Sequence, residues 1–165
     1  MVWLRLVHIL AGVFWVGAVV FVAAFLLPAA RTAGPAGRRF LGGLMRRTGP
    51  VFGVAMLLIV ISGLVMYSRL SAGFNRLWVT SRPGLALALG GAAAVLAAVV
   101  GGAVDRPVRV RIAALSKSVD TQGGAPTPEQ ARELAALQGR MERGAWIVAA
   151  LLVIAAGAMA VARYL

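Results

Sequence analysis

The N-terminal segment places the strongest constraint on the fold of this chain. Between Leu6 and Leu27 nearly every residue is apolar, and His8 is the only ionisable side chain in the run. A helix needs about 20 such residues, each rising about 1.5 Å, to cross a hydrocarbon core of about 30 Å. The apolar part of a cleaved signal peptide is shorter, about 7–15 residues. Residues 6–28 are therefore predicted to form a membrane-spanning helix that is retained.

Three more apolar segments follow, at residues 51–67, 84–104 and 145–162. Of the 165 residues, 61% are hydrophobic and 13% are charged, whereas about 25% are charged in a soluble domain. Together these observations predict an all-α fold, a transmembrane four-helix bundle that forms one integral membrane domain over residues 1–165. The chain has no cysteine, which excludes disulfides and thiolate metal sites.

The segments between the spans carry turn and helix signals. We expect residues 28–48 to form a loop with a turn at Gly34 and with a helical turn over residues 40–45 that leads into the second span. Residues 108–119 would prolong the third helix past Pro107, and residues 120–126 are expected to form a flexible linker. In the third loop, residues 105–144, Thr127 and Gln130 have the spacing of a capping box. This signal predicts a short amphipathic helix that packs on the end of the bundle or lies on the membrane surface. Its apolar face consists of Leu134, Leu137 and Met141.

The basic residues predict the orientation in the membrane. The net charge is +12, from 17 Lys and Arg against 5 acids. These bases lie between apolar segments, so we interpret them as topology signals and contacts with membrane lipids, and expect no binding of nucleic acid. Twelve of the 17 lie in the first and third loops. Residues 105–144 are therefore predicted to be cytoplasmic, with both termini outside.

His8 is the leading candidate for a functional side chain. A titratable ring inside an apolar span is costly, so it suggests a site. By the predicted topology His8 lies near the outer face, at the depth of Met66 in the second span and Met159 in the fourth. Histidine and methionine together suit haem iron or Cu(I). Methionine also fills gaps in apolar cores, so the shared depth has a simpler explanation as well.

Three residues share a helix face with His8, namely Gly12, Trp15 and Val19. Gly12 leaves a gap one turn from the imidazole, which is suited to a flat ligand. The alternative is that Gly12 admits a neighbouring helix and Trp15 is ordinary core. His8 would then be an interfacial residue bonded to water or to a carbonyl.

Other chemical signals are absent from the sequence. No span contains a carboxylate, which argues against a proton relay or cation pathway of the usual kind. There is no second histidine, no nucleophile beside a base, and no glycine loop of the phosphate-binding type. The sequence therefore favours a non-enzymatic role.

The first 105 residues carry a family resemblance. His8, Trp15 and Gly17 resemble the first span of the copper-resistance D-type membrane proteins and of the bacterial membrane-bound protoporphyrinogen oxidases. A group of short, uncharacterised four-span membrane proteins is similar as well and matches the length best. Further points of likeness are Arg46-Arg47, Ser62-Gly63-Leu64, and Trp78-Val79-Thr80-Ser81 with Gly84.

The resemblance implies a helix bundle and, in the oxidase branch, haem held at the histidine that corresponds to His8. That branch carries a lysine at the start of the third span, and residues 85–89 have none here. The difference argues against porphyrinogen oxidation. The copper-resistance proteins carry further metal-binding residues, which this chain lacks.

The sequence thus predicts an accessory protein of a bacterial-type inner membrane. It would bind haem b, or less favourably copper, through His8, with an electron-transfer or cofactor-handling role. Its partners would be membrane lipids and either further copies of itself or the subunits of a membrane complex. Two alternatives stay open: a structural or assembly subunit without a cofactor, and a small-molecule transporter. The transporter is the weaker of these, because the sequence shows no internal symmetry.

Overall fold

The computed structural model describes residues 1–123 and 125–165, which form helices and short turns without any strand. The elements are α1 (Val2–Phe21), η1 (Val22–Leu26), α2 (Leu27–Thr32), α3 (Gly34–Leu70), α4 (Arg76–Val79), α5 (Arg82–Val99), η2 (Val100–Val104), α6 (Asp105–Gln122), α7 (Pro128–Val161) and η3 (Ala162–Tyr164). The elements η1 and η2 are π-helical and η3 is a 3-10 turn.

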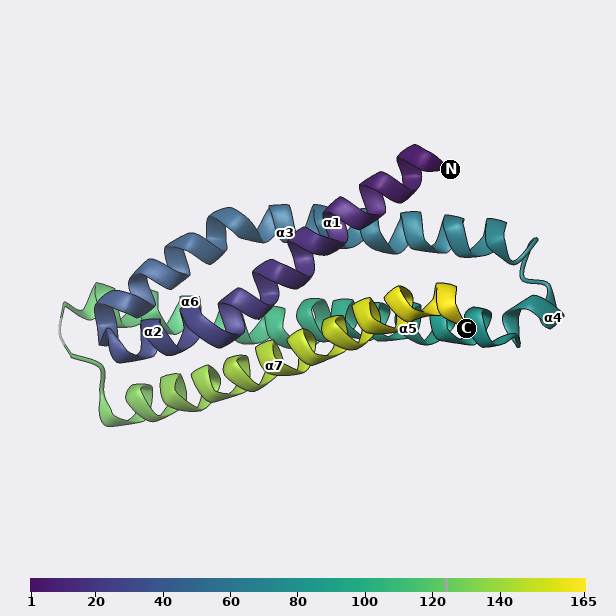
Figure 1. The fold of residues 1–165 in the computed structure, drawn as a ribbon. Helices are drawn as coiled ribbons and strands as arrows, with labels where there is room; N and C mark the ends of the chain where they lie inside the picture. Colours follow the sequence, from purple (N-terminus) through teal and green to yellow (C-terminus); the bar gives the residue numbers. More distant parts are fainter. Residues whose placement is uncertain (124) are drawn as a thin grey trace.

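These elements join into four long helical rods. Each is long and apolar enough to cross a membrane: Val2–Thr32, Gly34–Leu70, Arg82–Gln122 and Pro128–Tyr164. The rods run lengthwise together, with both termini at the end that holds α4 and with α2 and α6 at the opposite end (Figure 1). The predicted all-α four-helix bundle is confirmed, and the protein is a multi-pass membrane protein.

The rods extend further than the predicted spans. The helix expected from residue 40 begins earlier, at Gly34, so residues 28–48 are helical apart from a turn at Ala33, and the chain reverses where Gly34 adopts a φ of 62°. The third rod continues past Pro107 through α6 and ends at Gly123, whose φ is 67°. The predicted amphipathic helix exists as the first part of α7, continuous with the fourth span. Within the expected linker, Gly124 lies outside the described residues.

Proline accounts for both π-helical segments. A proline ring clashes with the carbonyl four residues earlier and has no N–H to donate. The carbonyl four residues before Pro28 belongs to residue 24, inside η1, and the carbonyl four residues before Pro107 belongs to residue 103, inside η2. In each case the wider π turn accommodates a proline without ending the rod. Pro50 lies within α3, which bends along its length in Figure 1.

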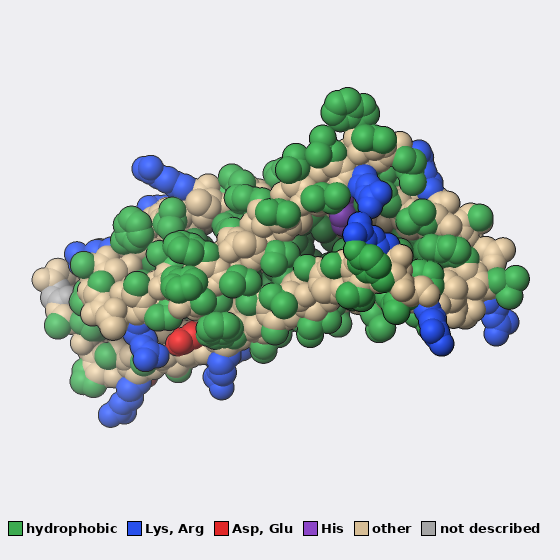
Figure 2. All heavy atoms as spheres, in the orientation of Figure 1, with side chains coloured by type: hydrophobic (Ala, Val, Ile, Leu, Met, Phe, Trp, Pro, Cys, Tyr) green, Lys and Arg blue, Asp and Glu red, His purple; other side chains and the backbone are tan. Residues whose placement is uncertain are grey.

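The core draws on all four rods. Trp15, with 5% of its surface exposed, packs with Ile59, Ala97, Val148 and Leu152. Many other large apolar side chains are exposed, as expected where the surroundings are lipid. On the face drawn in Figure 2, hydrophobic side chains cover the middle, and Lys and Arg gather toward the two ends. The interpretation of Trp15 as a core residue is confirmed.

Side-chain caps define where two of the rods begin. Thr127 and Gln130 form the predicted capping box at the start of α7, with both reciprocal bonds present. Ser81 caps α5 by accepting a hydrogen bond from the Gly84 N–H. The same turn brings Gly84 against the backbone of Trp78. These contacts fix the reversal between the second and third rods.

Candidate functional site

His8 lies between α1 and α3 and is half-buried. Its Nδ1 is 3.1 Å from the Ile59 carbonyl oxygen and 2.9 Å from Ser62 Oγ. Ser62 is itself buried, and its hydroxyl donates to the Leu58 carbonyl one turn earlier. The imidazole therefore points inward onto the second rod rather than outward to lipid.

These contacts determine which ring nitrogen carries the proton. A carbonyl oxygen only accepts, and the Ser62 hydroxyl hydrogen is already directed to Leu58. Nδ1 of His8 must therefore be the donor. In the neutral ring Nε2 then holds a free lone pair, and none of the hydrogen bonds in the described part of the chain uses it. That lone pair is available to a ligand.

The surroundings of the ring are tight on one side and open on another. A Cβ placed on Gly63 would lie 3.0 Å from His8 Cε1, so the ring rests directly on that glycine. A Cβ placed on Gly12 would have no described heavy atom within 4 Å other than those of its chain neighbours and the backbone of its own helix. Gly12 therefore does not mediate close helix packing, and the predicted gap one turn from His8 is present.

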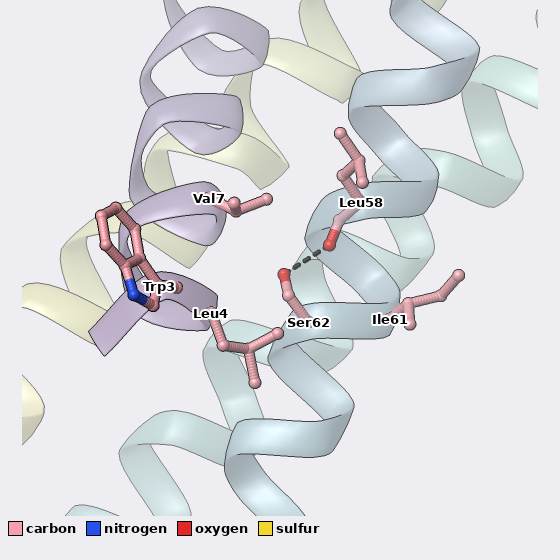
Figure 3. A pocket seen from close by; sticks show the side chains of 6 residues that line it. All are labelled: Trp3, Leu4, Val7, Leu58, Ile61 and Ser62. Carbon is pink, nitrogen blue, oxygen red and sulfur yellow. Dashed lines mark hydrogen bonds between the residues drawn. The ribbon is translucent and has the colours of Figure 1, made fainter. Parts of the chain in front are cut away.

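An apolar groove follows the seam between α1 and α3. Its six lining residues are Trp3, Leu4, Val7, Leu58, Ile61 and Ser62. Figure 3 shows the first three on α1 and the last three on α3, with Ser62 turned back toward Leu58. Ser62 thus belongs both to the groove and to the hydrogen bonds that hold His8. The groove is open and apolar, which suits an acyl chain or the edge of a flat apolar ring.

The structure places the two candidate methionines differently. Met66 is half-buried on α3, one turn beyond Ser62, on the side of α3 that carries the His8 contact. Met159 packs against Gly90, with its Cγ 3.0 Å from the position of a Gly90 Cβ. Met159 therefore lies in the α5–α7 interface, which is a different interface from the one that holds His8.

Sequence reasoning did not assign a role to Ser62 or Gly63, although both appear in the family resemblance. The signal that identifies them is polarity. Ser62 and Tyr67 are the only polar side chains between residues 51 and 67, and His8 is the only one in the first span. Polar groups inside lipid are expected to bond each other across helices. Antiparallel rods would therefore pair Ser62 with His8.

Replacing Ser62 by alanine tests this bond. We expect Ser62→Ala to lower the free energy of unfolding by about 0.6 kcal/mol, the average for polar contacts between membrane helices. Unfolding of the purified protein in a denaturing detergent, followed by circular dichroism, measures the change. Ser118→Ala is the matched control, because Ser118 is exposed on α6, and it should leave stability unchanged. Equal stability of all three proteins would contradict the assignment.

A second unusual side chain lies near the middle of the third rod, where α6 follows η2. Asp105 is 5% exposed and follows η2 directly. Its Oδ1 lies 2.0 Å from where a Gly144 Cβ would be, so the carboxyl sits on the backbone of α7. None of the ion pairs among the described residues includes Asp105. Its position one residue after the predicted span gives no sign in the sequence that the carboxyl is buried.

The fold and its apolar exterior define the class of the protein, which is an α-helical, multi-pass membrane protein. Comparisons with protein-family models, with curated proteins and with solved structures found no match to the chain. Within residues 1–123 and 125–165, no three His, Cys, Asp or Glu side chains come together as a metal site. The function is therefore inferred from the contacts of individual side chains.

Proposed function

We propose that the chain is an accessory membrane protein that binds haem b, with His8 as an axial ligand. The observation that carries the proposal is the fixed orientation of the imidazole. Its Nδ1 donates to the Ile59 carbonyl and to Ser62, which leaves Nε2 for a metal. Histidines that bind metals are commonly held in this way, because the second hydrogen bond fixes the tautomer and raises the basicity of the ligand.

The number of available ligands favours haem over a bare copper ion. Haem brings four porphyrin nitrogens and needs only one or two axial ligands from the protein. A copper site needs several protein ligands, and His8 is the only imidazole in the chain. Met66 is the better-placed partner of the two methionines, since it lies on α3, the helix whose Ile59 and Ser62 bond the His8 ring.

The remaining surroundings suit a flat, anionic group. The gap at Gly12 lies one turn from the imidazole, beside the buried Trp15. Arg5 and Arg69 are exposed at the same end of α1 and α3 and would pair with propionates. Bound haem supplies one-electron transfer, while the chain orients it and excludes water. We also place this end on the outer side of a bacterial-type inner membrane, because most of the bases lie at the other end.

An absorption spectrum of the purified protein tests the proposal. We expect a Soret band at about one haem per chain, which His8→Ala reduces to background because no other imidazole replaces it. Met66→Leu should shift the reduced spectrum and Met159→Leu should not, since Met159 packs against Gly90. A wild-type protein that is colourless and does not take up added haem would refute the proposal. Bound copper in that colourless protein would support the copper site, and its absence would support the assembly role.

A further inference from the structure

We propose that a groove on α7 binds one anionic phospholipid at the end of the bundle that carries most of the bases. The α7 groove is lined by Gly139, Glu142, Arg143, Trp146 and Ile147. These positions repeat at intervals of three and four residues, so they form one continuous face over two helical turns. The face lies where the amphipathic part of α7 gives way to the fourth span at residue 145, which is the depth of lipid headgroups.

The floor of the α7 groove is built around Gly139 and Arg143. Beyond the neighbouring residues and backbone of its own helix, no described heavy atom lies within 4 Å of the position of a Gly139 Cβ, so the floor is open. Arg143 Nε donates to the Gly139 carbonyl at 3.3 Å, which lays the guanidinium over that floor. A guanidinium has five N–H donors. Four therefore stay available, in the planar geometry that suits two phosphate oxygens.

The charges of the α7 groove favour an anion. Glu142 is its only acid, and Glu142 Oε2 is paired with Arg31 Nη1 of α2 at 3.5 Å. The charges of Glu142 and Arg31 cancel each other, so the net charge of the groove is about +1 and comes from Arg143. Basic pockets at the ends of membrane helices recognise anionic headgroups in this way.

The apolar part of the groove suits an acyl chain. Trp146 is 49% exposed and Ile147 is 52% exposed, just inside the fourth span. Val153 and Ile154 lie seven residues further along the same face and are exposed as well. Tryptophan is enriched at headgroup level, where its ring meets both water and lipid. An arginine above an exposed aromatic and aliphatic stripe thus matches a lipid that has a phosphate and a net negative charge.

Native mass spectrometry of the full chain, with phosphatidylglycerol and phosphatidylcholine of matched acyl chains, tests the site. We expect one phosphatidylglycerol to be retained more tightly than phosphatidylcholine. Arg143→Gln should weaken the retention of phosphatidylglycerol about fivefold, as expected for one basic group near an anionic surface. Glu142→Gln should strengthen it by a similar factor, because it removes a negative charge and frees Arg31. Damage to folding cannot produce that gain.

Arg132→Gln is the matched control, because Arg132 is an exposed base on α7 outside the groove. It should bind phosphatidylglycerol as the wild type does. Equal retention of the two lipids, equal loss with Arg132→Gln and Arg143→Gln, or weaker binding with Glu142→Gln would each overturn the proposal. Displacement of the lipid by millimolar inorganic phosphate would also overturn it, since the site would then recognise phosphate alone.

Discussion

Gly84→Ala should destabilise the protein by about 3 kcal/mol, the upper part of the range for overpacking in a closed site. A Cβ at Gly84 would lie 2.1 Å from the Trp78 carbonyl oxygen and 3.0 Å from that of Val79. Both are backbone atoms, so no side-chain rotation relieves the clash. The reversal between α4 and α5 must open, which also breaks the 3.3 Å hydrogen bond from the Tyr67 hydroxyl to the Gly84 carbonyl.

Thermal unfolding in detergent, followed by tryptophan fluorescence and circular dichroism, measures this effect. The control is Gly91→Ala on the same helix, because no described heavy atom beyond its chain neighbours and the backbone of its own helix lies within 4 Å of the Gly91 Cβ position. We expect it to be neutral or slightly stabilising, because alanine is the better helix former. Equal unfolding temperatures for the Gly84→Ala and Gly91→Ala proteins would contradict the close approach at this turn.

Gly144→Ala should cost about 1–3 kcal/mol, because its Cβ would occupy the position of the Asp105 carboxyl. Asp105 is short and buried, so it has little freedom to move aside. Adding Asp105→Ala removes the obstacle and should restore most of the lost stability. Asp105→Ala alone should be close to neutral, because it removes a buried carboxyl that has no ion-pair partner among the described residues.

The double-mutant cycle separates this contact from a general effect of alanine in α7. Its coupling energy should favour the double variant by at least about 1 kcal/mol, as found for residues in direct contact. Gly157→Ala provides the control on the same helix, since no described heavy atom beyond its chain neighbours and the backbone of α7 lies within 4 Å of its Cβ position. If the loss of stability in the double variant equals the sum of the losses in the two single variants, Asp105 and Gly144 do not share one packing site.

The site was only partly predictable from the sequence. His8 was recognisable as an ionisable ring in an apolar span, and Gly12 as the gap beside it, because both inferences need only the spacing of a helix. The partners of His8 could not be recognised in the sequence, because Ser62 is 54 residues away and its pairing with His8 depends on how two rods are rotated and staggered. The same rotation turns Met159 of α7 toward Gly90 of α5 and away from the His8 interface, although Met159 and His8 share a predicted depth.

By itself the sequence determined the all-α bundle, the four crossings and the helix start at Thr127. The length and hydrophobicity of a segment predict a membrane-spanning helix, because in lipid every backbone N–H and C=O must be hydrogen-bonded within the chain. The spacing of Thr127 and Gln130 predicts the helix start, because a capping box involves only neighbouring residues. Only the tertiary structure decided that Asp105 is buried on Gly144 and that the imidazole is held through Nδ1. These features depend on contacts between helices, and in lipid such contacts are set by the fit of individual side chains rather than by an apolar pattern.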